Sequence, residues 1–229
     1  MPGRLIVVAT PIGNLSDLST RATETLSAAD VIACEDTRHT GRLLSRLGIK
    51  KKLVSLHEHN ERQRLGQLMA LLDSNQTIAL VSDAGTPLVS DPGFVLVRSA
   101  IEAGIEVQHV PGASAVLTAL VVSGLPPYPF TFIGFPPPRS GKRRSFFSRF
   151  ADLEHTLVMF ESPHRVIKCV EDLVSVLGDR PAVVGRELTK LHEEVLRGTL
   201  ATILGDLQKR PSLKGEFTVV VSRPTRETS

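Results

Sequence analysis

The sequence predicts an α/β protein built from two α/β domains, and three observations lead to this prediction. Short apolar segments rich in β-branched residues alternate with segments whose apolar residues recur at helical spacing. Most apolar segments lead directly into a polar or Gly/Pro-rich loop. A proline-rich stretch over residues 124–129 marks a change of composition. We therefore expect an N-terminal α/β domain over residues 1–123, a linker over 124–129 and a C-terminal α/β domain over 130–229.

The composition is that of a globular protein with a mildly basic charge. The 229 residues are 41% hydrophobic and 22% charged, and the net charge is +3, which excludes wholesale disorder and permits an anionic partner without requiring one. Cys34 and Cys169 lie in apolar runs and match neither a redox pair nor a zinc pattern, which indicates free thiols in a reducing compartment. Neither a signal peptide nor an apolar run of membrane-spanning length is present, so we expect a soluble, cytoplasmic protein without a membrane partner.

The elements of the first domain follow from periodicity and from turn residues. Strands are expected over residues 5–9, 31–34, 53–56, 78–81 and 106–110. Helices are expected over residues 17–29, 40–47, 65–72, 94–101 and 115–122. Asn60 with Gln63 is typical of a capping box at the start of the third helix. Asp91 and Pro92 are expected to be the N-cap and first position of the fourth helix.

The elements of the second domain are predicted in the same way. Strands are expected over residues 130–135, 157–160, 182–185 and 217–221, and a helix over 200–207. Ser162 and Pro163 are expected to start a helix that reaches Leu177. Residues 139–150 mix arginines with phenylalanines, and two interpretations stay open. The arginines bind a nucleic-acid backbone, or the segment is a helix whose phenylalanines pack inward while its cations are merely solvated.

The loop over residues 82–93 (SDAGTPLVSDPG) is the strongest candidate for a binding site. It lies between a predicted buried strand and a predicted helix, and Asp83 would stand at the carboxyl end of that strand. Gly85 and its small neighbours would let backbone amides approach a ligand closely. Similar loops follow the other strands in both halves, so we expect them to gather on one edge of each sheet and to face a shared interdomain cleft.

Several motifs that would assign another chemistry are absent from the sequence. There is no GxGxxG, GxSxG or HExxH motif, and the spacing around Lys142 does not fit a Walker A loop. His57 and His59 would point the same way in an extended segment, but the spacing supplies no third ligand. We therefore predict no metal site and interpret these histidines as part of a substrate-facing polar strip.

Seven segments in this order closely resemble the small-subunit ribosomal RNA (cytidine-2′-O)-methyltransferase family, which belongs to the tetrapyrrole-methylase superfamily. The segments are residues 10–15, 35–38, 57–61, 82–93, 111–115, 160–165 and 186–190. The resemblance implies a tetrapyrrole-methylase-like fold and a homodimer that uses S-adenosyl-L-methionine to methylate a ribose 2′-hydroxyl of a cytidine in small-subunit (16S) ribosomal RNA. Members of the family often carry a further carboxyl-terminal segment, and this chain ends at Ser229, so we expect either a short member or one that lacks that piece.

The resemblance also implies which residues form the site. In the superfamily the cofactor lies folded in the interdomain cleft. The implied cofactor-binding residues are Pro11, Asp83, Ala84, Gly85, Thr86, Ser114, Ala115, Phe160, Leu188, Glu216 and Phe217. The residues expected to contact the substrate RNA are His57, His59, Asn60, Arg139, Arg143, Arg144, Arg165 and Arg186. The arginines are included because guanidinium groups match phosphate oxygens.

A ribose hydroxyl is a poor nucleophile, so a group that takes its proton should assist the reaction. The expected catalytic residues are Asp36, Arg38, Glu161, His164 and Lys190, and His57, Glu58 and Glu193 are further candidates for the base. Two alternatives remain. One is a tetrapyrrole or other small-molecule methylase of the same fold, and the other is a non-catalytic RNA-binding module that keeps the pocket.

Overall fold

The computed structural model describes residues 3–224, which fold into two compact units that divide between Ser114 and Ala115. Each unit has one five-stranded sheet, so the predicted α/β class is confirmed. The division falls before the predicted linker at 124–129, because helix α5 (Ala115–Ser123) packs against the second sheet. None of the helices in the described part of the chain is both long and apolar enough to cross a membrane.

The sheet of the first unit is parallel throughout, in the order β3-β2-β4-β1-β5. Its strands are β1 (Arg4–Val8), β2 (Val31–Cys34), β3 (Lys52–Ser55), β4 (Ile78–Val81) and β5 (Glu106–Val110). Its helices are η1 (Leu15–Asp17), α1 (Thr20–Ala28), α2 (Thr37–Arg46), α3 (Glu61–Asp73) and α4 (Phe94–Glu102). Because all five strands run the same way, the loops that follow them lie on one edge of the sheet.

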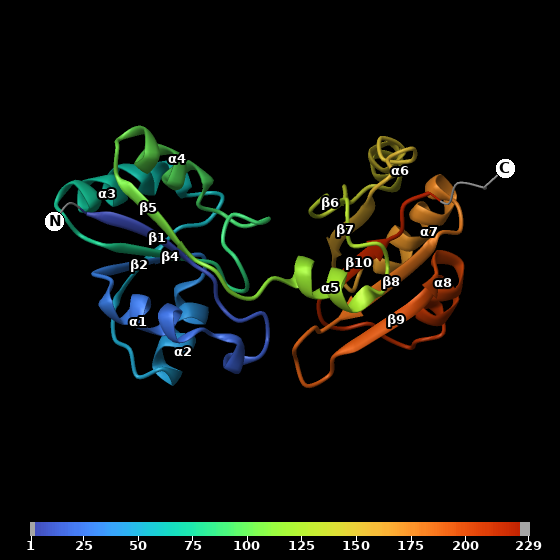
Figure 1. The fold of residues 1–229 in the computed structure, drawn as a ribbon, viewed down its shortest axis with the longest axis horizontal. Helices are drawn as coiled ribbons and strands as arrows, with labels where there is room; N and C mark the ends of the chain where they lie inside the picture. The colour runs from blue at the N-terminus through green and yellow to red at the C-terminus, as the bar shows by residue number, and fades with distance from the viewer. Residues whose placement is uncertain (1–2, 225–229) are drawn as a thin grey trace. The chain divides into compact units, whose positions relative to one another are not determined.

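Helices cover both faces of this sheet (Figure 1). Leu26 of α1 and Leu44 of α2 pack with Ile32 and other strand residues on one face. Leu68 of α3 and Leu96 of α4 pack on the opposite face. The central strands β2 and β4 are buried along their whole length, which explains why they appear in the sequence as continuous apolar runs.

The sheet of the second unit is mixed, in the order β6-β7-β10-β8-β9. Its strands are β6 (Phe130–Phe132), β7 (Thr156–Glu161), β8 (Pro181–Arg186), β9 (Glu194–Thr199) and β10 (Phe217–Val221). Strand β6 is parallel to β7, and the other neighbouring pairs are antiparallel. Helices α6 (Ser140–Ser148), α7 (Val166–Leu177) and α8 (Leu200–Gln208) enclose one hydrophobic core with the sheet, while α5 contacts β7, β8, β9 and β10 (Figure 1).

Two predicted helix starts were wrong. Helix α4 begins at Phe94 with Gly93 as its N-cap, and α7 begins at Val166 with Arg165 as its N-cap. In both cases the proline lies in a turn before the helix rather than at its first position. The predicted capping box was also wrong, because the Asn60 side chain bonds to the backbone of Ser55 and His57 instead.

One strand was not predicted from the sequence. Strand β9 pairs with β8 along its whole length and forms one edge of the second sheet. Its residues are half-buried or exposed, and they include Glu194, Arg197 and Gly198. A strand of this kind lacks the strong apolar alternation on which the other strands were recognised.

Candidate active site

The topology of the first sheet points to the neighbouring strands β1 and β4. After β1 the chain passes to α1 on one face of the sheet, and after β4 it passes to α4 on the other face. The two loops therefore diverge from adjacent strands in opposite directions. Open α/β sheets bind ligands outside the carboxyl ends of their strands at such a point.

Backbone hydrogen bonds join the loops at this point. Thr10, after β1, and Gly85, after β4, form an isolated antiparallel bridge with N···O distances of 2.8 and 3.1 Å. The Thr86 hydroxyl donates to the carbonyl of Ala113, after β5, at 3.2 Å. Gly85 has a φ of +81°, and a Cβ at this position would stand 3.2 Å from Ile12 Cγ2. The structure thus brings together the predicted segments around Pro11, Asp83–Thr86 and Ser114.

The Asp83 carboxylate connects this cluster to the loop after β2. Its Oδ1 accepts a hydrogen bond from the Asp36 amide at 3.1 Å. Asp36 is itself the N-cap of α2 and accepts bonds from the Arg38 backbone amide and from its guanidinium. These bonds from Arg38 hold the pKa of Asp36 well below its usual range. Asp36 is therefore a stable anion and a weak proton acceptor, which argues against its predicted role as the base.

Carboxylates gather at this edge of the sheet, and their pKa values respond to one another. Burial raises the pKa of Asp91 to about 6, and the nearby charges of Glu35 and Asp83 act in the same direction, against a hydrogen bond from Ser82. Burial also raises the pKa of Glu35, again with Asp83 contributing. The edge is thus rich in acceptors and negative charge. Among the described residues, no group of three or more His, Cys, Asp or Glu side chains is arranged to hold a metal ion.

The loop between β4 and α4 is strained and is fixed from outside. Leu88 and Ser90 have φ values of 72° and 70°, which side chains other than glycine seldom adopt. Glu61, at the start of α3, accepts hydrogen bonds from the Gly93 and Val95 amides at 3.1 and 2.9 Å and so caps α4. Backbone strain of this kind concentrates at binding sites. The role of Glu61 was missed because the helix that it caps, α4, is distant from it in the sequence.

In the second unit the strand registers also bring the predicted segments to one edge. Phe217, at the start of β10, pairs with Glu161 at the end of β7 and with Arg186 at the end of β8. Arg186 pairs in turn with Glu194, at the start of β9. The antiparallel strands therefore bring their first residues to the edge where β7 and β8 end. The predicted gathering of loops on one sheet edge holds here too.

Side-chain direction separates the predicted cofactor residues of this unit. Phe160, Thr218 and Gly185 form one row across β7, β10 and β8, so the side chains of Phe160 and Thr218 share a face of the sheet. Leu188 folds over Gly185, where a Cβ would stand 3.0 Å from its Cδ2. Phe217 points to the opposite face and its side chain is buried in the core, while its predicted place in the cofactor site stays a prediction.

The loop between β8 and β9 is held by ion pairs. Lys190 Nζ lies 2.9 Å from Glu187 Oε1 and 3.1 Å from Glu216 Oε2. Partial burial alone would lower the pKa of Lys190, but these two carboxylates outweigh it and raise the pKa. Lys190 is therefore protonated near neutral pH and cannot serve as the base. Glu187 and Thr189 have positive φ values, and the buried Thr189 Oγ1 has no hydrogen-bond partner within residues 3–224.

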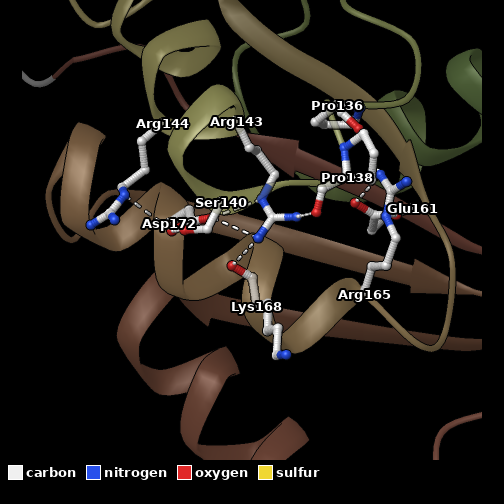
Figure 2. Close-up of polar contacts among 9 residues, drawn as sticks. All are labelled: Pro136, Pro138, Ser140, Arg143, Arg144, Glu161, Arg165, Lys168 and Asp172. Carbon is white, nitrogen blue, oxygen red and sulfur yellow. Dashed lines mark hydrogen bonds and ion pairs between the residues drawn. The ribbon is translucent and has the colours of Figure 1, made fainter.

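Glu161 was predicted to be catalytic, but its carboxylate is buried and engaged. Its oxygens lie 2.8 Å from Arg165 Nε and 2.9 Å from Arg165 Nη2, and Oε1 also accepts from the Ser162 amide. Figure 2 shows this pair beside Pro136. A carboxylate that is buried and engaged in this way is not free to approach a substrate hydroxyl, which argues against the predicted catalytic role. Arg165 is likewise committed to an internal ion pair rather than free to clamp a phosphate.

Arg143 was predicted to contact RNA, and this prediction was wrong. Its residue exposure is 1%, and its guanidinium pairs with Asp172 at 2.6 Å (Figure 2). Phe147 is buried, and Phe146 and Phe150 pack against the same core, so the aromatic residues of 139–150 face inward. Arg139 is exposed at the N-cap of α6, and Arg144 is exposed although it lies 3.6 Å from Asp172.

The remaining predicted residues lie on turns or at strand ends. His164 is exposed in the turn before α7, and its ring has no hydrogen bond or ion pair within the described residues. His57 and His59 lie in a turn rather than in an extended segment, with ring centroids 6.1 Å apart. Arg186 pairs with Glu194 at 3.5 Å and donates to the Lys214 carbonyl.

Comparison with known proteins finds a matching family model, similar proteins in other bacteria and solved structures of the same fold. The family model for tetrapyrrole (corrin/porphyrin) methylases matches residues 4–204. "Ribosomal RNA small subunit methyltransferase I" of Xylella fastidiosa is 50% identical over 96% of this chain and 81% of that protein. The protein of the same name from Escherichia coli O157:H7 is 47% identical over 96% and 77% of the two chains. Among solved structures, diphthine synthase has a TM-score of 0.74 at 18% identity and covers 96% of this chain and 90% of its own. The methyltransferase CobJ has a TM-score of 0.73 at 18% identity, with coverages of 99% and 97%.

Proposed function

The chain belongs to the tetrapyrrole (corrin/porphyrin) methylase family, and we propose that it is an S-adenosylmethionine-dependent ribose methyltransferase. Its substrate is the 2′-hydroxyl of a cytidine in small-subunit (16S) ribosomal RNA. The substrate class rests on the names of relatives that share about half of its residues. The observation that best supports this activity is that the loops after β1, β4 and β5 meet at one edge of the first sheet, where the chain leaves β1 and β4 toward opposite faces.

The residues at this edge fit S-adenosylmethionine by their chemistry. The cofactor has an ammonium group, a sulfonium and two ribose hydroxyls, and the edge supplies the carboxylates of Asp83, Asp91 and Glu35. Such carboxylates accept hydrogen bonds from hydroxyl and ammonium groups and attract a cation. When bound, the cofactor supplies a methyl group that is already activated for transfer.

The protein must hold the ribose oxygen in place and receive its proton. Of the five residues predicted for this work, Asp36 and Lys190 have pKa values shifted the wrong way, and Glu161 is buried in an ion pair. We propose His164 as the base, since its imidazole is exposed and free of partners within the described residues. Replacing it with Gln should lower kcat about 10²–10⁴-fold.

The substrate side of the proposal rests on exposed cations. Arg38 is 85% exposed at its side chain, and Arg139 and Arg144 are exposed at α6. These guanidinium groups are suited to RNA phosphates, whereas Arg143 and Arg165 are used inside the protein. A homodimer and a cytoplasmic location remain part of the proposal.

A second enzyme function, methylation of a tetrapyrrole, shares the fold, because the structural neighbours include uroporphyrin-III-C-methyltransferase as well as the methyltransferase CobJ. The level of identity favours the RNA substrate, since those neighbours are only 18–24% identical to this chain.

The test is transfer of a labelled methyl group to isolated small ribosomal subunits, with uroporphyrinogen as the competing substrate. Asp83→Asn is the informative variant, because it removes the charge and can still accept from the Asp36 amide. Asp30→Asn is the matched control, since Asp30 accepts from the Thr77 amide at 2.7 Å at the opposite end of the same sheet. We expect Asp83→Asn alone to weaken cofactor binding about tenfold or more. Transfer to uroporphyrinogen and not to subunits would overturn the proposal.

A further inference from the structure

Phe135 is an exposed aromatic side chain to which the proposed function gives no role. The residue is 57% exposed, just after the point where β6 stops pairing with β7 at Gly134. Its ring centroid lies 5.5 Å from that of Phe160, which lies 4.9 Å from that of Phe132. The ring therefore rests against an aromatic pair on the sheet and leaves more than half of the residue in solvent.

The loop after Phe135 is held from within by two arginines (Figure 2). The Pro136 carbonyl accepts a hydrogen bond from Arg165 Nη2 at 2.6 Å, and the Pro138 carbonyl accepts one from Arg143 Nη1 at 3.3 Å. Proline has no backbone N–H, so the carbonyls are the backbone groups by which this run of three prolines can be fixed. Both guanidinium groups thus serve as anchors for the loop.

Each anchor is fixed by a carboxylate in turn. Glu161 holds Arg165, and Asp172 holds Arg143 with help from the Ser140 hydroxyl, which donates to Asp172 Oδ1 at 2.7 Å. Buried ion pairs add little net stability, but they define geometry. An aromatic ring on a loop held this firmly loses little conformational freedom when a ligand stacks on it, which favours binding.

Exposed cations follow the loop directly. Arg139 is the N-cap of α6, and Lys142 lies in its first turn, both exposed. Three prolines lie between Phe135 and Arg139, which limits the Cα atoms of these two residues to roughly 14 Å apart. Proteins bind single-stranded RNA by stacking its bases on aromatic rings and by pairing its phosphates with nearby cations.

We propose that Phe135 stacks on an unpaired base of the substrate RNA, while Arg139 and Lys142 contact the adjoining phosphates. The identity of the RNA rests on the proposed function, but the stacking site is an additional assignment. It gives Arg143 and Arg165 a purpose as positioning residues, in place of the direct RNA contacts that the sequence had predicted for them.

The experiment compares Phe135→Leu, Phe135→Trp and the control Phe94→Leu, in which an equally exposed phenylalanine of the first unit is changed. Binding of a fluorescein-labelled, cytidine-containing single-stranded RNA and binding of S-adenosylmethionine are measured for each. We expect Phe135→Leu to weaken RNA binding about tenfold, in line with the contribution of one stacked base, and to leave cofactor binding unchanged. Phe135→Trp should bind RNA at least as tightly as the parent, and Phe94→Leu should match it.

The inference is overturned if Phe135→Leu binds RNA like Phe94→Leu, if tryptophan does not restore binding, or if cofactor affinity falls as much as RNA affinity. Methyl transfer to isolated small subunits separates this result from the proposed function, since Phe135→Leu should raise KM about tenfold at unchanged kcat. Absence of transfer by the parent protein, with RNA binding still dependent on Phe135, would defeat the proposed function and leave the stacking site. Normal transfer with an unchanged KM in Phe135→Leu would support the proposed function and defeat the stacking site.

Discussion

The two sheet edges that carry the predicted site are built by different means. In the first unit the loops are joined through the backbone, as in the bridge between Thr10 and Gly85. In the second unit charged side chains make the links: Lys190 of the loop after β8 pairs with Glu216 before β10, and Arg165 after β7 donates to the Pro136 carbonyl after β6. A backbone link tolerates most side-chain changes but depends on glycine where space is short. A side-chain link fails when one charge is removed, so the two edges should respond differently to mutation and to acid.

The largest effect is expected from Asp172→Ala in the second unit. The change leaves the Arg143 guanidinium buried without its carboxylate, which should cost about 3–5 kcal/mol in the free energy of unfolding. Urea unfolding followed by circular dichroism measures it. Glu102→Ala is the control, because it removes an exposed pair with Arg98 in the first unit and should cost less than about 1 kcal/mol. Equal losses would mean that the buried pair is not a structural anchor.

A smaller effect is expected from Gly85→Ala in the first unit. The new Cβ would crowd Ile12 at a positive φ, which should destabilise the protein by about 2–3 kcal/mol and weaken cofactor binding. Gly104→Ala separates the two causes, since Gly104 has a φ of +72° but a Cβ added there would meet no described atom within 4 Å. It should cost about 1–2 kcal/mol and leave cofactor binding unchanged. A loss of cofactor affinity in both variants would break the proposed link between the Thr10–Gly85 bridge and the site.

The contributions of the two edges to the stability of the fold should also change with pH in opposite directions. Burial raises the pKa of Asp91 to about 6, above its value of about 3.9 in unfolded chains, so the folded state gains stability as pH falls from about 6 to 4. Hydrogen bonds from Arg210 lower the pKa of Glu194, so its stabilisation is present above its unfolded pKa of about 4.3 and is lost as pH falls below that value.

Thermal midpoints of two variants between pH 3.5 and about 8 test this difference. Asp91→Asn should raise the midpoint at neutral pH, and its advantage should vanish near pH 4. Glu194→Gln should lower the midpoint at neutral pH, and its deficit should shrink only in stronger acid. Parallel pH profiles for the two variants would contradict the assignment of opposite electrostatics to the two edges.

The smallest effect is expected from Arg38→Ala. The Arg38 side chain is 85% exposed, so removal of its pair with Asp36 should leave the free energy of unfolding nearly unchanged, and the bond from the residue 38 amide to Asp36 can persist. The pKa of Asp36 should rise toward its usual range, which NMR titration of its carboxyl carbon would detect. A loss of stability similar to that of Asp172→Ala would remove the distinction between surface and buried pairs.

The features set by local pattern could be predicted from the sequence. The buried strands β2 and β4 are continuous apolar runs, and the loop with Asp83 and Gly85 follows the second of them directly. Their meeting with the loops after β1 and β5 follows from parallel strand order, which the alternation of strands and helices implies.

The features set by distant partners could not be predicted. The starts of α4 and α7 were placed too early because proline at a helix start and proline in a preceding turn look alike in sequence. Arg143 was taken for an RNA contact because its partner Asp172 lies on another helix. The direction of the Phe217 side chain, in contrast, follows from alternation along β10, which predicts that it faces the opposite side of the sheet from Thr218.

The central claim is that this chain methylates a cytidine ribose in small-subunit RNA, and one measurement tests it most directly. Small ribosomal subunits from cells that lack the protein are incubated with it and with S-adenosylmethionine carrying a deuterated methyl group, and the digested RNA is analysed by mass spectrometry. The account predicts that the label appears on the ribose of a cytidine and is absent from the bases. Label on a base, or no label while the cofactor binds normally, would contradict it.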